Sequence, residues 1–309
     1  MVPSVGSEMD PSELREVVLD TTVNLLRLAE TELPADAVEA IRKALTKESS
    51  DVAKAQLDAI SRNLEVAGEG KIPMCQDTGT IIFYADVGSD FPLLSDLREI
   101  LTEGTKRATE EVPLRPNAVN PFTGENSGDN TGNMIPFVNI DIGKGDTLRL
   151  SVLPKGGGSE NTCSLKMLKP GEGIAGVKKA VIETVVEAGA KPCPPIILGV
   201  GVGGGADISL KLAKKALLRP IDNRHPDPQV AALESELLTL TNELGIGAMG
   251  LGGDTTVLGV NVEYAHRHPA SLPVGIAIQC WAARRATAEI SVDGKVTYLT
   301  HTAPEGAEQ

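Results

Sequence analysis

The hydrophobic pattern of the chain changes its period near residue 70, and this change limits the folds that the chain can adopt. Between residues 10 and 66, apolar residues recur at spacings of three and four in three stretches, separated by turn residues at Pro34 and Ser49–Ser50. This spacing predicts three amphipathic helices. The run TIIFYADVG that follows residue 70 is typical of a β-strand, and further strand-like and helix-like segments come after it.

These segments predict an α/β fold of mixed α+β character, in which an N-terminal helical segment precedes a mixed sheet flanked by helices. We expect residues 1–68 to pack as helices on a main catalytic domain of residues 69–309. MIPFVNIDIG and TLRLSVLP are expected to be paired strands, and ATAEISVDGKVTYLT a hairpin with its turn at Asp293–Gly294. Only 3% of the residues are aromatic, so the core must consist of Val, Ile, Leu and Ala.

Charge and hydropathy exclude several classes of protein. The net charge of −13 opposes binding to nucleic acid, and no basic run with interleaved aromatic residues offers a local exception. The N-terminal residues lack the pattern of a signal peptide, and no window of about 18 residues is uniformly apolar. We therefore expect a cytoplasmic protein without a membrane segment.

The four cysteines lie far apart in the chain, and a reducing compartment would keep them as thiols. Their spacing lacks the CxxC pairs that indicate zinc. However, Cys75, Cys193 and Cys280 each lie in a turn or at a strand end beside proline, glycine or charged residues, which favours metal binding or catalysis. Cys163 precedes an apolar run and is equally consistent with core packing, which also remains the alternative for any cysteine taken alone.

The run GVGVGG at residues 199–204 satisfies the GxGxxG pattern of dinucleotide-binding proteins. A nicotinamide-dependent oxidoreductase is therefore one hypothesis. Such a site also requires an acidic residue at the end of a second strand about 20 positions later, where this chain has LLRPIDNRHPDPQ instead. The glycines are better explained by close packing of the backbone.

Eight motifs occur in one order along most of residues 70–290 and together resemble the class I, iron-sulfur fumarase family. They are PMCQDTGT, LRPNAV, NSGDNTG, KGGGSEN, KPCPP, GLGGDTT, RHPASLPVGIA and QCWAARRA. The chain is more similar still to the alpha subunits of two-subunit fumarate hydratases, whose relatives include tartrate dehydratases. Several of these motifs are long and therefore specific.

The resemblance implies a four-iron, four-sulfur (4Fe-4S) cluster held by Cys75, Cys193 and Cys280, with one iron open to substrate oxygen. Cys163 matches no ligand position. An open iron can act as a Lewis acid on a hydroxyl or carboxylate group, as the removal of water from a 2-hydroxy acid requires. The polar, glycine-rich stretch from Pro113 to Asn133 is expected to border this site.

The same resemblance assigns roles to polar residues. Asp77 is the expected general acid, although a turn aspartate that bonds the amides of Thr78 and Gly79 is the alternative. His268 matches a catalytic-site histidine at the substrate, whereas His266 receives no role.

Three further residues are expected to bind the substrate. Arg115 matches a substrate-binding arginine, and a guanidinium group suits a small dicarboxylate because it offers two parallel donors to each carboxylate. Gln76 is expected beside the substrate, and the backbone of the glycine loop around Gly157 is expected to donate amide hydrogen bonds to a carboxylate.

Single-chain members of the family carry a further domain that supplies the catalytic base and additional cations. The resemblance therefore implies a separate beta subunit, in a heterodimer or heterotetramer. KGGGSEN favours fumarate and malate as substrates, which would place the enzyme in the tricarboxylic acid cycle, while tartrate or mesaconate remain alternatives. A different class, a non-catalytic scaffold subunit with structural cysteines, also remains open.

Overall fold

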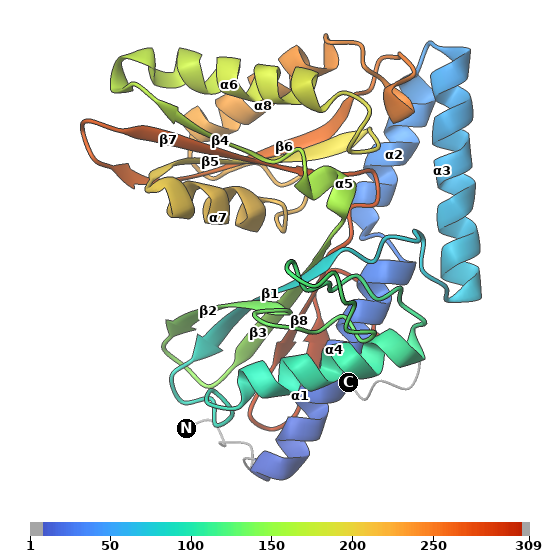
Figure 1. The fold of residues 1–309 in the computed structure, drawn as a ribbon, viewed down its shortest axis with the longest axis vertical. Coiled ribbons are helices and arrows are strands. Elements are labelled where there is room, and N and C mark those ends of the chain that lie inside the picture. Colours follow the sequence, from blue (N-terminus) through green and yellow to red (C-terminus); the bar gives the residue numbers. More distant parts are fainter. Residues whose placement is uncertain (1–8, 305–309) are drawn as a thin grey trace, which may run out of the picture. The chain divides into compact units, whose positions relative to one another are not determined.

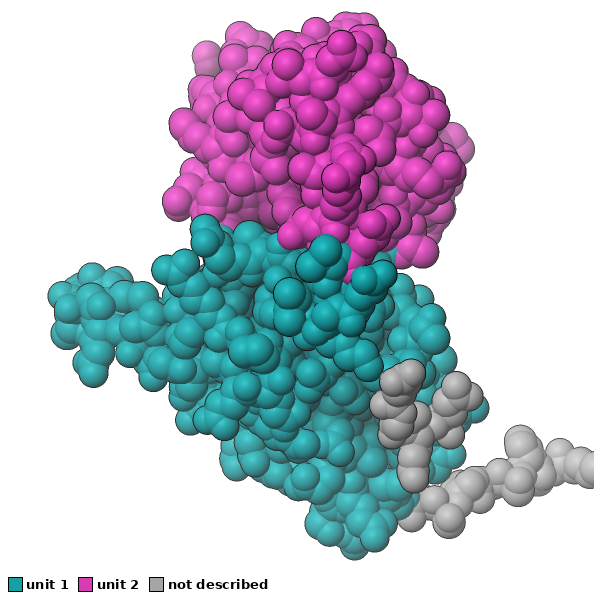
Figure 2. All heavy atoms as spheres, turned by 90° about the vertical axis from the view of Figure 1, so that its right-hand side faces the viewer, with its two compact units in different colours: residues 1–34, 66–155, 284–309 teal, residues 35–65, 156–283 magenta. Residues whose placement is uncertain are grey.

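The computed structural model describes residues 9–304, and these fall into two compact units that interleave along the sequence. Unit 1 takes its residues from 1–34, 66–155 and 284–309, and unit 2 from 35–65 and 156–283 (Figure 2). No helix among the described residues has both the length and the apolar character needed to cross a membrane.

Unit 1 is a mixed five-stranded sheet covered by helices on one face. The sheet has the order β2-β1-β3-β8-β9, in which β1 and β2 are parallel and the other neighbours antiparallel. Its elements are α1 (Pro11–Thr31), β1 (Thr80–Gly88), α4 (Leu97–Glu111), β2 (Phe137–Gly143), β3 (Leu148–Lys155), β8 (Ala286–Ile290) and β9 (Val296–Tyr298).

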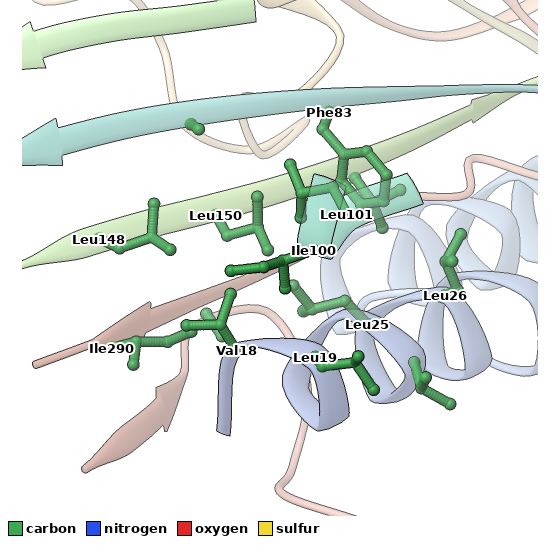
Figure 3. Close-up of a cluster of buried hydrophobic side chains, with 14 of the residues drawn as sticks. Val18, Leu19, Leu25, Leu26, Phe83, Ile100, Leu101, Leu148, Leu150 and Ile290 are labelled. Atoms are coloured by element: carbon green, nitrogen blue, oxygen red, sulfur yellow. The ribbon is translucent and has the colours of Figure 1, made fainter. Parts of the chain in front are cut away.

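The core of unit 1 lies where α1 and α4 pack on this sheet. α1 begins at Pro11, whose fixed φ suits the first helical position, and Asp10 caps the helix by accepting the N–H of Ser12 at 2.9 Å. Leu25 of α1, Ile100 of α4 and Leu150 of β3 lie in one buried cluster (Figure 3). Aliphatic side chains dominate this cluster, as the composition predicts.

Unit 2 places helices on both faces of a four-stranded sheet of order β4-β7-β5-β6, with α6 and α8 on one face and α7 on the other (Figure 1). β5 and β6 are parallel, and β7 is antiparallel to β5 and β4. Its elements are α2 (Ala35–Lys47), most of α3 (Asp51–Gly70), α5 (Gly157–Glu160), β4 (Ser164–Leu168), α6 (Gly173–Ala188), β5 (Ile196–Gly204), α7 (Ala206–Ala216), α8 (Pro228–Asn242), β6 (Val257–Arg267) and β7 (Leu272–Gln279).

The α/β class is confirmed, as are the three N-terminal helices, α1 to α3, and the C-terminal hairpin, β8 and β9. The prediction that MIPFVNIDIG pairs with TLRLSVLP was wrong, because β1 lies between the two strands and bonds to both. The division into residues 1–68 and 69–309 stays a prediction. The two compact units are defined by contacts within each unit, and each draws residues from both sides of residue 68.

The glycines of the GVGVGG run have a packing role in the structure. A Cβ at Gly199 would lie 2.0 Å from the carbonyl oxygen of Ala213, and one at Gly201 would lie 2.0 Å from that of Ser209. Both oxygens belong to α7, so the glycines let this helix approach β5 closely.

Gly199→Ala is therefore expected to destabilise the chain by about 1–3 kcal/mol, the usual range for overpacking in a core. Urea unfolding of the variant would measure the loss. Gly143→Ala is a matched control, because a Cβ at Gly143 meets nothing within 4 Å. An equal loss of stability in both variants would contradict the packing role of Gly199.

Candidate active site

The candidate site residues are divided between the units. Unit 1 contains Cys75, Gln76, Asp77 and Arg115, and unit 2 contains Gly157, Cys193, His268 and Cys280.

In unit 1, Cys75 lies in the short segment between α3 and β1. Its side chain is half-buried, and its Sγ accepts the backbone N–H of Asp77 at 3.5 Å. Hydrogen bonds to sulfur tune the properties of cysteine ligands in iron-sulfur proteins. Gln76, between these two residues, is exposed.

The Asp77 carboxylate is held in place by two donors. Its Oδ1 accepts the N–H of Gly79 at 2.9 Å and the side-chain amide of Asn117 at 3.0 Å. The first bond is the turn interaction that the sequence offered as an alternative role, and the second links the Asp77 turn to the LRPNAV segment. The geometry is compatible with an acid role for Asp77, which stays a prediction.

Asn130 supports this arrangement from within the polar loop. Its side chain is buried and accepts the N–H of Asn117 at 2.7 Å, while its amide donates to the carbonyl of Arg115 at 3.2 Å. Its φ of 60° is a conformation that asparagine tolerates better than most residues. Asn130 thus fixes the backbone of both Arg115 and Asn117, and the exposed side chain of Arg115 extends from a rigid segment. Asn130 was not among the residues predicted for the site, although it lies in the NSGDNTG motif.

A buried ion pair lies beside the Cys75 segment, and the sequence analysis also missed it. Nη1 of Arg284 lies 2.8 Å from Oε2 of Glu30, and the two side chains are 1% and 0% exposed. The same Nη1 donates to the carbonyl oxygen of Asp77, and the carbonyl of Glu30 accepts the N–H of Met74 at 2.8 Å. The available signal was the charged pair Arg284–Arg285, which follows an apolar strand and lies in buried surroundings.

Burial raises the pKa of Glu30 to about 7, against the opposing effect of the Arg284 charge and with a smaller contribution from the charge of Asp77. The folded chain therefore holds a proton that the unfolded chain releases near pH 4.5. Stability from this group is complete below that pH and is lost as the pH rises through about 7.

Comparison with Glu30→Gln isolates this effect. Between pH 5 and 7, the unfolding free energy of the wild type is expected to fall relative to that of the variant by about 1 kcal/mol per pH unit. Urea unfolding at a series of pH values measures the difference, and a constant difference would contradict the shifted pKa of Glu30.

In unit 2, the structure brings Cys193 and Cys280 to the same end of the sheet. Cys193 precedes β5, Cys280 follows β7, and these antiparallel strands pair Ile197 with Gln279. The N–H of Trp281 donates to the carbonyl of Cys193 at 3.2 Å. A backbone hydrogen bond therefore links the segments that carry two cysteines 87 positions apart in the sequence (280 − 193).

The Cys193 turn is fixed by its neighbours in the same unit. Cys193 has a φ of 53°, and its N–H donates to the carbonyl of Ala190 at 3.0 Å. The N–H of Met249, just before the GLGGDTT motif, donates to the carbonyl of Pro194 at 2.7 Å. Gly250 is required here, because a Cβ would lie 2.3 Å from that of Ala190.

The glycine loop also lies against this turn. Gly157 is exposed at the start of the short helix α5, and a Cβ at Gly158 would lie 3.0 Å from the carbonyl oxygen of Lys191. The loop, the Cys193 turn and Cys280 thus form one cluster in unit 2. Binding of a substrate carboxylate by Gly157 stays a prediction.

His268 lies in the hairpin between β6 and β7, at the end of β7 opposite Cys280. β7 has eight residues, so at about 3.3 Å per residue its ends are about 23 Å apart. Nδ1 of His268 accepts the N–H of Ala270 at 3.1 Å. The structure does not bring His268 to Cys193 and Cys280 within unit 2, and its role stays a prediction.

Comparison with known proteins identifies the family. A profile of the fumarate hydratase (Fumerase) family matches residues 19–289, which is most of the chain. The chain belongs to this family. The resemblance seen in the motifs is thereby confirmed, and the chain belongs to a class of hydro-lyases.

Three relatives of this Fumerase-family chain show how far the similarity extends. A protein of Methanocaldococcus jannaschii, provisionally named L(+)-tartrate dehydratase subunit alpha, is 51% identical over 283 residues, covering 90% of this chain and 99% of the relative. The L(+)-tartrate dehydratase subunit alpha of Escherichia coli strain UTI89 is 38% identical over 297 residues, covering 96% of this chain and 98% of the relative. The protein of the same name from strain K12 is 37% identical with the same coverage.

The three candidate ligands of this family member suit an iron-sulfur cluster by their chemistry. All four cysteines lie among the described residues and are thiols outside any disulfide, with Cys193 exposed and Cys75 and Cys280 half-buried. Accessible thiols are the donors that iron-sulfur clusters require. Within each unit, the described residues contain no group of three His, Cys, Asp or Glu side chains arranged to hold a metal. The suitability of these residues for a cluster therefore rests on the chemistry and accessibility of the three thiols.

Cys163 differs from these three cysteines in its surroundings. Its Sγ donates to the carbonyl of Ser159 at 3.4 Å and approaches Oε2 of Glu160 at 3.7 Å. Both neighbours are hydrogen-bond acceptors, so this thiol is already engaged as a donor within its own segment. Cys163 is therefore the natural control among the four cysteines.

Proposed function

We propose that this chain is the alpha subunit of an iron-sulfur hydro-lyase that catalyses the reversible hydration of fumarate to malate. The observation that most strongly supports this proposal is the arrangement in unit 2, where Cys193 and Cys280 meet beside the glycine loop. Membership of a hydro-lyase family and the third thiol, two residues before Asp77, add to it.

Cys75, Cys193 and Cys280 would hold a 4Fe-4S cluster, which supplies a Lewis acid for a substrate oxygen when it is bound. The remaining steps belong to side chains and backbone. Asp77, fixed by Gly79 and Asn117, exchanges a proton with the departing or entering water.

Binding of the dicarboxylate is assigned to an arginine, an amide side chain and a backbone N–H. Arg115 offers a guanidinium that no carboxylate of the described residues pairs with, and Gln76 lies exposed beside Cys75. Gly157 contributes its backbone N–H, whereas His268, at the end of β7 opposite Cys280, is left out of this set. A chain with a net charge of −13 needs such cationic and donor groups to hold a dianion.

L(+)-tartrate is the second candidate substrate, because the relatives from M. jannaschii and E. coli carry names of tartrate dehydratase subunits. Fumarate is supported by the family description and by the KGGGSEN motif. Mesaconate differs from fumarate by one methyl group, which a pocket discriminates by only about 1–3 kcal/mol.

A separate beta subunit is part of the proposal. The relatives are named as alpha subunits, which supports assembly with another chain in a heterodimer or heterotetramer. The beta chain would supply the catalytic base and further cations. The purified alpha chain alone is then expected to be inactive, and adding the partner should restore turnover.

The deciding experiment is anaerobic copurification of this chain with its partner, followed by analysis of iron and sulfide and by ultraviolet assays with each substrate. About four irons per alpha chain and turnover of fumarate are expected. If the enzyme contains iron but turns over only tartrate, tartrate replaces fumarate as the proposed substrate. A protein without iron would overturn the cluster assignment. The oxidoreductase and scaffold hypotheses would then have to be tested instead.

Air should inactivate the enzyme, because an iron that is open to substrate is also open to oxygen. Activity is expected to be lost on aeration and to recover with ferrous iron and a reductant under nitrogen. Activity that survives prolonged aeration would contradict an exposed iron.

A further inference from the structure

Two opposite charges in unit 1, Glu30 and Arg284, are buried where no catalytic role has been assigned. Glu30 lies near the C-terminal end of α1, and Arg284 lies just before β8. Their side chains are 0% and 1% exposed, with 2.8 Å between Oε2 and Nη1. They are 254 positions apart in sequence, so only the folded unit brings them together.

Both residues bond to the backbone of one short segment, Met74–Asp77. The carbonyl of Glu30 accepts the N–H of Met74 at 2.8 Å, and Nη1 of Arg284 donates to the carbonyl of Asp77. The main chain of Glu30 therefore holds one end of this segment, and the Arg284 side chain, which pairs with the Glu30 carboxylate, holds the other, with Cys75 and Gln76 between them.

Stability alone is a weak explanation for such a pair. Removing two charges from water is costly, and a buried ion pair can often be replaced by well-packed apolar residues without loss of stability. Oε1 of Glu30 has no hydrogen-bond partner in the described structure, so the carboxylate is incompletely compensated. The hydrogen bond from the Arg284 side chain to the Asp77 carbonyl indicates a positional role instead.

We propose that Glu30 and Arg284 are positioning residues that fix the Met74–Asp77 backbone and so set the directions of the Cys75 thiol and the Asp77 carboxylate. The catalytic meaning of this role rests on the proposed function. The positioning itself is a property of the folded chain and can be tested without iron.

The side chain of Arg284 is suited to this task because one planar group donates to Glu30 and to the Asp77 carbonyl together. Lysine keeps the charge, but its nitrogen on an unbranched chain does not take the position of Nη1, from which both of these bonds start. Arg284→Lys is therefore the principal variant. Glu30→Gln, which is nearly isosteric, is the second variant if the first does not fold.

Unit 2 offers a matched control in Arg219→Lys. Arg219 pairs with the buried Glu234, and the exposed fractions of the two side chains are 15% and 0%. Arg219 also donates to the backbone carbonyls of Asn223 and Val262, but these residues lie on other segments than the candidate ligands. The control breaks a comparable ion pair without touching the Met74–Asp77 segment.

The first measurement is hydrogen exchange, followed by mass spectrometry, on the full-length chain without iron. Amides in peptides covering residues 74–79 are expected to exchange about fivefold faster in Arg284→Lys, as the loss of its hydrogen bond to the Asp77 carbonyl predicts. A smaller acceleration is expected in Glu30→Gln, which keeps the main-chain bond to Met74 and acts on the segment only through Arg284. Peptides of β1 and β3 should exchange at the wild-type rate. Arg219→Lys should leave residues 74–79 unchanged.

The second measurement uses the anaerobic enzyme with its partner subunit. The two variants are expected to lose cluster iron, or to keep it with kcat reduced about tenfold to a hundredfold at a nearly unchanged KM, as a small misplacement of reacting groups predicts. Arg219→Lys should keep both its iron and its kcat.

Three results would overturn the proposal. They are unchanged exchange at residues 74–79, equal acceleration throughout the sheet of unit 1, and equal acceleration of residues 74–79 in Arg219→Lys. If the wild-type enzyme has neither iron nor hydratase activity, the proposed function fails, while the exchange measurement still decides whether Glu30 and Arg284 position the segment.

Discussion

Serine at position 75, 193 or 280 is expected to remove the iron and to lower turnover by about a thousandfold or more. A serine hydroxyl is a poor replacement for a thiolate at iron, and loss of the Lewis acid removes several kcal/mol of transition-state stabilisation. Iron and sulfide analysis of each anaerobically purified variant, with kcat for the preferred dicarboxylate, measures both effects. The fold should persist, because Cys75, Cys193 and Cys280 are exposed or half-buried and form no disulfide.

Cys163→Ser is the control for this series. The hydroxyl can replace the thiol as donor to the Ser159 carbonyl, so iron and turnover should stay at the wild-type values. If Cys193→Ser retained full iron and turnover, Cys193 would be removed from the ligand set. Iron loss in all four variants would indicate general instability rather than ligation.

Asn in place of Asp77 is expected to lower kcat by about a hundredfold to ten-thousandfold, the usual contribution of a general acid. The amide keeps the shape of the carboxylate and can still accept the N–H of Gly79 and the amide of Asn117 through its oxygen. Only the exchangeable acid proton is lost. Steady-state kinetics with parallel iron analysis would show the loss of turnover in a protein that retains its cluster.

Asp90→Asn serves as the matched control, because Asp90 is an exposed aspartate in the same unit. Its kcat should equal that of the wild type. If Asp77→Asn also turns over at the wild-type rate, the carboxylate has only its turn role. If it loses iron together with activity, Asp77 supports the cluster rather than proton transfer.

Local patterns were enough to predict much of the fold. Apolar residues that recur at spacings of three and four positions predicted α1 to α3, and the Asp293–Gly294 turn predicted the hairpin of β8 and β9. The order of strands in the first sheet was not predictable in this way. β2 and β3 are adjacent in sequence, but β1 lies between them, and an inserted strand leaves no mark on the periodicity of its neighbours.

The candidate site likewise contains residues that the local sequence predicts and residues that only the fold reveals. Cysteines in unusual surroundings can be recognised in the sequence, and the motifs made Cys75, Cys193 and Cys280 specific candidates. The groups that hold them act through contacts between distant segments. Glu30 and Arg284 are 254 positions apart, and neither has a local pattern that predicts its partner. Asn130 lies among other asparagines, from which only its burial distinguishes it.

The interleaving of the two units has a consequence for the order of folding during synthesis. The chain passes from one unit to the other at residues 34/35, 65/66, 155/156 and 283/284, so neither unit is a continuous stretch of sequence. β8 lies inside the sheet of unit 1 but is synthesised after all four strands of the unit 2 sheet. Until residue 290 has emerged, β3 has one unpaired edge and Glu30 has no Arg284 to pair with. Nascent chains stalled before that point should therefore remain sensitive to proteases in both α1 and β3, and the Cys75 segment should acquire its final form only once Arg284 and β8 have emerged.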